Sequence, residues 1–104
     1  MRIVWLPKAI ANRDAQLDYV AQANMRAAIE QGDRIEHQVS QLLEHPEMGR
    51  PGRAKNTREL VVSRTPFIIV YRVRPKVKRI ELLRLLHGSQ QWPPQGRATT
   101  FPAS

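Results

Sequence analysis

The side chains best suited to chemistry lie in the second half of the chain, and they are one histidine and several cations. His87 is the only histidine of the basic segment, and its ordinary pKa allows it to act as an acid or a base near neutrality. Arg53, Lys55, Arg72 and Arg84 could hold a phosphate. Cleavage of a phosphate ester without a metal needs a base for the attacking hydroxyl, an acid for the leaving oxygen and cations at the phosphate. The candidate catalytic residues are therefore His87, Arg84, Arg72 and Lys55.

Each of these residues also has a structural explanation. His87 ends a predicted strand and could serve only to cap it through hydrogen bonds, and any one of the arginines could simply be solvated on a sheet face. Trp92 could stack a nucleic-acid base, or it could pack its ring over the core as a hydrophobic lid. The residues that we expect to contact a macromolecular target are Arg53, Arg58, Arg74 and Trp92.

Charge is divided unevenly along the chain. The formal net charge is +8 and the sequence pI is about 11.1. Residues 1–49 hold five basic and seven acidic side chains, whereas residues 50–84 hold eleven basic and two acidic ones. Such asymmetry is typical of a protein that meets a polyanion or an acidic protein partner, although a basic surface can also serve solubility alone.

Length and composition exclude several classes of protein. A chain of 104 residues fits one domain. No apolar run approaches the roughly 18 residues that a membrane helix needs, and the apolar stretch near the N-terminus is far shorter than the apolar region of a signal peptide, so we expect a cytoplasmic protein with no membrane partner. The chain has no cysteine, and its three histidines share no ligand-like spacing, so we expect neither a metal nor a cofactor.

A strand and two helices are the first elements that must position these residues. Residues 2–6 are rich in β-formers, and Pro7 suits the first turn of a helix. Asn24 can cap a second helix, which must end before the Pro- and Gly-rich segment 45–52. The apolar positions with helical spacing are Ile10, Leu17, Val20 and Ala21 in the first helix and Ala28, Ile35, Val39 and Leu42 in the second.

Three antiparallel strands are predicted after this segment, at residues 59–63, 67–74 and 77–87, joined by turns short enough for hairpins. Alternate residues of the middle strand form two different faces. We expect the first face to receive the helices and the second to stay open. The first face is Phe67, Ile69, Tyr71 and Val73, and the second is Ile68, Val70, Arg72 and Arg74.

A helical hairpin followed by a β-meander must bury its apolar stripe on one face of the sheet. We therefore predict an α+β fold, a two-layer sandwich in which the N-terminal strand joins the same sheet as the meander. Residues 1–93 form the single domain, and the Pro-rich residues 94–104 are predicted to be a flexible tail.

The order of these segments resembles the RelE/ParE superfamily of bacterial type II toxins. The resemblance covers residues 1–93 and implies a small toxin, encoded with an antitoxin that covers its surface. Members of the RelE branch cut mRNA on the ribosome without a metal, whereas members of the ParE branch poison DNA gyrase. The matching segments are Trp5, GRPGR at 49–53, TRELVV at 57–62, PFIIVYRV at 66–73 and IELLRLLHGSQQW at 80–92.

Departures from the RelE pattern favour the ParE-like branch. Ile68 stands where ribonuclease members typically carry an arginine, and Gly-Ser-Gln-Gln follows His87 where they carry an arginine and then a tyrosine. ParE-like members often carry Arg-Asp after the histidine, which this chain also lacks. The resemblance thus implies a plasmid-stabilisation toxin that docks on DNA gyrase through its basic sheet face. The alternative is a ribosome-dependent mRNA endoribonuclease, so whether the chain is an enzyme stays open.

A cognate antitoxin is the partner that the resemblance implies. Toxins of this architecture offer their antitoxin a hydrophobic groove. We expect that groove among the outward apolar residues of the helical hairpin and at two sheet positions, Ile68 and Val70.

Overall fold

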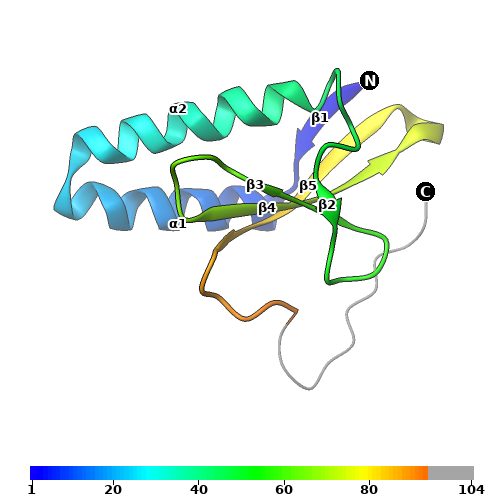
Figure 1. Cartoon of the computed structure of the whole chain (residues 1–104). Helices are drawn as coiled ribbons and strands as arrows, with labels where there is room; N and C mark the ends of the chain where they lie inside the picture. Colours follow the sequence, from blue (N-terminus) through cyan, green and yellow to red (C-terminus); the bar gives the residue numbers. More distant parts are fainter. Residues whose placement is uncertain (94–104) are drawn as a thin grey trace.

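One mixed sheet and one helical hairpin make up the structure, a computed structural model that describes residues 1–93 (Figure 1). The strands lie in the order β1-β5-β4-β3-β2, with β1 parallel to β5 and the other pairs antiparallel. The predicted α+β fold is confirmed, including the pairing of the N-terminal strand within the sheet of the meander. The predicted tail, 94–104, lies outside the described residues. The elements are β1 (Arg2–Trp5), α1 (Pro7–Ala23), α2 (Met25–Gln41), β2 (Arg50–Pro51), β3 (Arg58–Val61), β4 (Phe67–Arg74), the 3-10 turn η1 (Pro75–Val77) and β5 (Arg79–His87).

The two helices are joined by a single residue, Asn24. Its backbone N–H donates to the Val20 carbonyl at 2.8 Å and so ends α1, while its side-chain oxygen accepts from the Ala27 N–H at 3.0 Å and so caps α2. α1 begins at Pro7, where the missing N–H costs no helical hydrogen bond. The tight connection makes the helices antiparallel neighbours that cover one face of the sheet together.

The helix-covered face of the sheet forms the main core. As predicted, Phe67, Ile69 and Tyr71 are buried there and Val73 packs against them. The expected α2 positions Ile35, Val39 and Leu42 join this cluster, and so does Ala9 of α1. The expectation for Ile10 is wrong, because its side chain is 37% exposed. Helical geometry turns Ile10 about 100° away from Ala9, and Ala9 is the residue that faces the core.

The opposite face of the sheet is not open, which corrects the prediction. Ile68 is only 8% exposed and Val70 is completely buried, so neither residue can contribute to an antitoxin groove. The irregular β2–β3 loop and the segment after β5 fold over this face, and the latter runs below the sheet in Figure 1. The prediction weighed Trp92 as a lid over the core but otherwise considered regular elements only, and it therefore missed this second layer. The second core cluster consists of Ala54, Val70, Leu83, Leu86 and Trp92, with Leu6 packed against it.

A β-bulge in β5 decides which of its residues face the helices. Tyr71 pairs with Leu82 and Val70 pairs with Arg84, which leaves Leu83 as the extra residue. Simple alternation along the strand cannot reproduce this arrangement. Residues that face the helices are Leu82 and Leu85, and those that face the second layer are Leu83, Arg84 and Leu86.

The turn before β5 also differs from its prediction. Pro75–Val77 forms a 3-10 turn and Lys78 takes a left-handed conformation, with φ of 52°, so β5 begins at Arg79 and not at residue 77. Pairing of β3 with β4 stops at Tyr71. The end of the β4–β5 hairpin therefore extends beyond β3 (Figure 1).

Candidate functional site

A buried carboxylate, Glu59, organises the first group of cations. Its side chain is completely buried and accepts hydrogen bonds from Arg50 Nη2 at 3.1 Å, from Arg53 Nε at 3.1 Å and from the Arg53 backbone N–H at 2.8 Å. Burial alone would raise the pKa of Glu59, but the hydrogen bonds from Arg53 and Arg50 outweigh it and lower that pKa below its ordinary value. The carboxylate thus stays charged and orders the loop after β2.

A second buried carboxylate, Glu81, organises three guanidinium groups on the same side of the sheet. Arg72 Nε donates to it at 2.7 Å, Arg79 Nη2 donates at 2.6 Å, and Arg74 Nη1 lies 3.6 Å away. Glu81 is only 3% exposed. Burial would raise the pKa of Glu81, but hydrogen bonds and positive charge from Arg72, followed by those from Arg79, lower it.

These two clusters explain why buried strands carry so many basic residues. Each carboxylate is bound by more than one cation, so each cluster retains a positive surplus. The predicted target contacts Arg53 and Arg74 belong to them, with side chains 43% and 32% exposed. The cations are therefore arranged on fixed carboxylates and still reach solvent.

Arg84 and Trp92 form a third feature of this face. The Arg84 guanidinium lies 5.7 Å from the centroid of the Trp92 ring and donates to the Leu83 carbonyl at 2.6 Å. Burial lowers the pKa of Arg84. Trp92 is only 8% exposed and packs in the second core cluster, the position of a hydrophobic lid. Contact between Trp92 and a target stays a prediction.

His87 lies at the end of β5, apart from the cations proposed to act with it. It pairs with Phe67, whose ring is in the helix-side core, whereas Arg84 pairs with Val70 on the other side. Its Nδ1 accepts from the Ser89 N–H at 3.2 Å and lies 2.8 Å from Ser89 Oγ. These contacts are those expected of a residue that caps a strand end.

The four candidate catalytic residues are spread over the molecule. Arg72 and Phe67, the residue that pairs with His87, are five residues apart in β4, which separates Arg72 from His87 by about 16 Å at about 3.3 Å per residue. Lys55 is exposed in the β2–β3 loop. The structure thus brings Arg84 close to Trp92, but it does not bring His87 and Arg72 together.

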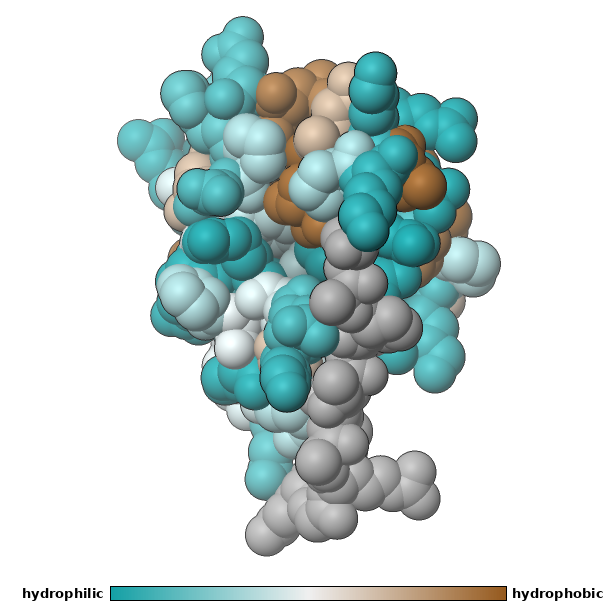
Figure 2. All heavy atoms as spheres, turned by 90° about the vertical axis from the view of Figure 1, so that its right-hand side faces the viewer, coloured by the Kyte–Doolittle hydropathy of each residue, from teal (hydrophilic) through white to brown (hydrophobic). Residues whose placement is uncertain are grey.

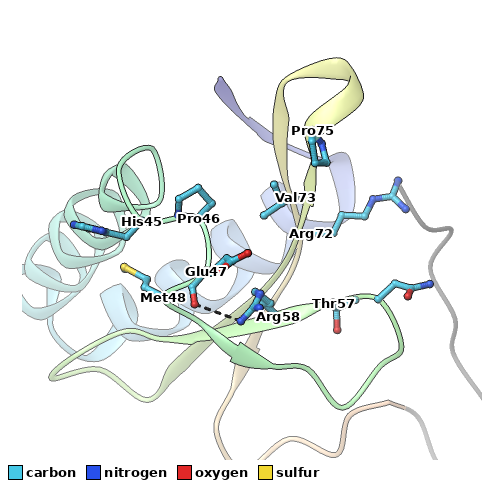
Figure 3. Close-up of a pocket in the computed structure, with 10 residues that line it drawn as sticks. His45, Pro46, Glu47, Met48, Thr57, Arg58, Arg72, Val73 and Pro75 are labelled. Atoms are coloured by element: carbon cyan, nitrogen blue, oxygen red, sulfur yellow. Dashed lines mark hydrogen bonds between the residues drawn. The ribbon is translucent and has the colours of Figure 1, made fainter.

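A cavity of about 890 Å³ lies between the segment that follows α2, the start of β3 and the end of β4. The sequence analysis did not predict it. Arg58, a predicted target contact, donates from Nη1 to the Gly49 carbonyl at 2.7 Å and to the Glu47 carbonyl at 3.3 Å. Figure 3 shows Arg58 between Glu47 and Thr57. The GRPGR segment was the sequence signal for this cavity, because its first residue, Gly49, supplies one of the carbonyls that Arg58 binds. The lining residues are His45, Pro46, Glu47, Met48, Asn56, Thr57, Arg58, Arg72, Val73 and Pro75.

Tyr71 ties the loop before β2 to the sheet at this cavity. Its hydroxyl donates to the Pro46 carbonyl at 2.7 Å and accepts from the Gly49 N–H at 2.9 Å. A Cβ at Gly49 would lie 2.7 Å from the Tyr71 ring and hydroxyl. Only glycine fits this approach, so the loop packs closely against β4 beside the cavity.

Known proteins are similar to this chain in sequence and in fold. The family model described as the ParE toxin of the type II toxin–antitoxin system parDE matches residues 3–92. The candidate toxin Y4kP of Sinorhizobium fredii is 40% identical over 92 residues, which cover 88% of this chain and 93% of Y4kP. Toxin RelE2 of Caulobacter vibrioides is 33% identical over 89 residues, which cover 86% of this chain and 97% of RelE2.

Among solved structures, a chain of the chromosomal ParDE toxin–antitoxin system from P. aeruginosa superposes with a TM-score of 0.74 and 30% identity. The match covers 84% of this chain and 95% of that chain. The protein belongs to the ParE toxin family of type II toxin–antitoxin systems, within the RelE/ParE superfamily. Among residues 1–93, neither helix is long and apolar enough to span a bilayer.

Proposed function

We propose that the chain is a growth-inhibiting toxin that acts in the cytoplasm by binding DNA gyrase, without covalent chemistry of its own, and that a cognate antitoxin neutralises it. The observation that carries this proposal is the arrangement of the cations. They are held on Glu59 and Glu81 as a shaped, positively charged surface. Such a surface suits recognition by charge complementarity.

Separation of His87 from the cations argues against RNA cleavage as the mode of action. An acid or base must reach the proton that it transfers, at about 2.6–3.2 Å or through one water. His87 leaves the sheet on the helix side, whereas Arg84 leaves it on the other side. Ile68, where nuclease members are expected to carry an arginine, is buried. A docking toxin needs none of these groups to converge.

The surface that we propose for the target consists of Arg53 and Arg74 on the second-layer side of the sheet, together with Arg58, which lies on the helix side at the neighbouring cavity. Arg53 and Arg74 are ordered by Glu59 and Glu81, and Arg58 is ordered by the carbonyls of the loop before β2. Ordered guanidinium groups lose less conformational entropy on binding than free ones. Trp92 packs with Ala54, the residue that follows Arg53, in the second core cluster.

The antitoxin surface that we propose is on the helical hairpin. Tyr19 is 74% exposed, Met25 63% and Ile29 58%. Met25 and Ile29 lie four residues apart and so share one face of α2. Large apolar side chains with this exposure are typical of a site that a partner covers.

The proposal is tested by expressing the chain alone in bacteria and reading two outputs from one culture, the incorporation of labelled methionine and the DNA-damage response. We expect growth arrest with damage signalling while translation is initially intact. An early fall in translation, with mRNA cut at ribosome-bound codons, would overturn the proposal in favour of the endoribonuclease. Absence of arrest would contradict both activities.

A further inference from the structure

The end of the β4–β5 hairpin concentrates positive charge beyond what the fold requires. β4 continues past its last pairing with β3, at Tyr71, so Arg72–Arg74 pair with β5 alone. Arg2 of β1 pairs with Arg79 on the other side of β5. We call Arg2 and residues 72–79 the hairpin tip. Its cations are Arg2, Arg72, Arg74, Lys76, Lys78 and Arg79.

The hairpin tip holds six basic residues and is balanced by one buried carboxylate, Glu81, which leaves a net charge of +5. Glu47, which lines the cavity beside Arg72, is a further acid at this end of the molecule. The face of the molecule that carries the hairpin end is turned to the viewer in Figure 2. That face is largely hydrophilic, with apolar side chains gathered toward its upper part.

Stability of the fold does not account for this surplus. Arg74 lies directly opposite Arg79, and Arg79 lies directly opposite Arg2. Like charges in directly opposed positions of neighbouring strands are destabilising. One guanidinium with bidentate geometry would be enough to neutralise Glu81, yet three surround it. This cost in stability indicates that the positive charge is present to bind a ligand.

The geometry points to a ligand with regularly repeated negative charge. Alternate residues of one strand recur about every 7 Å on one face, and neighbouring strands lie about 4.8 Å apart, so the tip presents a two-dimensional array of cations. Duplex DNA carries one negative charge per about 1.7 Å of helix axis, and a two-stranded β-ribbon fits its major groove. Val77, 48% exposed at the apex between two lysines, can contact the sugars.

We infer that the hairpin tip binds the phosphate backbone of duplex DNA. Gyrase is an enzyme that works on DNA, so DNA binding by the tip fits the proposed action on gyrase. The biological role of this DNA binding rests on that proposed function. Glu81 holds the guanidinium groups of Arg72 and Arg79 in place, and Lys76 and Lys78 extend the array into the turn. Binding is independent of base sequence, because only the sugar–phosphate backbone is contacted.

The test measures binding of the full chain, made by cell-free synthesis, to a fluorescently labelled duplex of mixed sequence, by anisotropy over a series of salt concentrations. The tip variant is Lys76→Gln/Lys78→Gln. The control variant, Lys8→Gln/Arg26→Gln, removes the same charge from exposed helix positions. Circular dichroism confirms that both variants are folded.

We expect the unmodified chain to bind with an affinity that falls steeply as salt rises. The tip variant should bind about tenfold more weakly or worse, and the slope of log K against log salt should become shallower by about 2, since each neutralised phosphate contributes about 0.9. The control should keep the affinity and slope of the unmodified chain within about twofold. Equal losses in both variants would mean attraction by net charge alone and would overturn the inference.

A competition experiment distinguishes DNA from an acidic protein partner. Polyglutamate at the same concentration of charge should displace the duplex poorly, and efficient displacement would overturn the assignment to DNA. The binding assay contains no gyrase, so its result does not depend on the target of the toxin. Loss of DNA binding by the tip variant, together with unchanged gyrase inhibition, would support the tip as a DNA site and show that gyrase is recognised elsewhere.

Discussion

At the scale of the residue, two buried glutamates hold the arginines of the sheet in place. Glu59 and Glu81 are the only acids among residues 50–84, and both accept hydrogen bonds from arginines. Without them the arginines would repel one another. Each carboxylate thus converts mutual repulsion into an ordered group of cations with a positive surplus.

Replacement of Glu81 by Gln should destabilise the protein. The change leaves Arg72, Arg74 and Arg79 facing one another without a negative charge. Loss of one partner from a buried cluster costs about 3–5 kcal/mol, and we expect about 2–4 kcal/mol here because the guanidinium groups reach solvent. Urea unfolding measures this loss. The exposed Glu44→Gln is the control, and a loss of the same size there would contradict the explanation.

Stability should also fall in acid. The pKa values of Glu59 and Glu81 are below the ordinary value of 4.5 in the folded state, so the unfolded chain binds more protons as pH falls. Their contribution is fully present above about pH 5 and is lost progressively at lower pH, as the folded carboxylates protonate. Thermal unfolding between pH 3 and 7 measures how steeply the stability changes with pH. A flatter profile is expected for Glu81→Gln, and an unchanged profile would contradict this assignment.

Replacement of His87 by Ala should leave growth inhibition nearly intact. His87 is an exposed residue at a strand end, and its Nδ1 accepts from Ser89. If it were the acid or base of an RNA-cleaving site, mRNA cleavage would fall by about 10²–10⁴-fold. Growth curves and primer extension on cellular mRNA distinguish the two outcomes. Ser89→Ala, which removes one contact of the ring, is the matched control.

At the scale of the element, irregular segments complete the sheet. The loop before β2 is bound to β4 through Tyr71, and the β2–β3 loop covers Val70 through Ala54. The free end of β3 is also protected, since the Gln38 side chain donates to the Val61 carbonyl at 3.1 Å and accepts from the Ser63 N–H. These contacts satisfy backbone groups that would otherwise recruit another strand.

Two Gly→Ala substitutions should have opposite effects on stability, because one glycine is in a tightly packed loop and the other is at a helix position with space for a Cβ. Gly49→Ala forces a Cβ to within 2.7 Å of Tyr71 and 2.9 Å of the Glu59 carbonyl, so we expect a loss of about 1–3 kcal/mol. Gly32 lies within α2, and a Cβ added there would contact only Leu17, at 3.6 Å. Gly32→Ala should therefore stabilise the protein by about 0.5–1 kcal/mol. Equilibrium unfolding compares the two. Equal effects would contradict the tight contact at Gly49.

At the scale of the whole molecule, two surfaces of different character lie at opposite ends. The exposed apolar residues Tyr19, Met25 and Ile29 surround the turn between the helices, and the hairpin tip lies at the far end of the sheet (Figure 1). The helical part of the chain is slightly acidic and the sheet part is strongly basic. We therefore expect that neutralisation and target binding can be separated by mutation.

Replacement of Ile29 by Glu should impair neutralisation and spare toxicity. Ile29 is 58% exposed, so stability should change by no more than about 0.5 kcal/mol. Burying the new charge against an apolar partner surface is costly, so the co-expressed antitoxin should no longer restore growth. Growth rescue and co-purification measure this effect. Glu30→Gln, on an adjacent exposed position, is the control, and full rescue of the Ile29 variant would place the antitoxin elsewhere.

Local patterns were enough to predict both helices, the strands β1, β3, β4 and β5, and most of the main core, but not β2 or the turn η1. Asn24 separates two helices because its side chain caps the second, and the alternation from Phe67 to Val73 identifies the helix-covered face. These features depend on near neighbours in the chain, so periodicity and capping rules reach them. The sequence alone also determined the excess of cations in residues 50–84.

Tertiary structure alone decided how those cations are used. Arg53 meets Glu59 and Arg72 meets Glu81 across loops and strands, and the bulge at Leu83 sets which residues of β5 face each layer. Burial of Val70 depends on irregular segments that have no periodic signal. Charge counts can be read from composition, but the pairing of charges depends on strand register and loop packing, which arise only when distant segments meet.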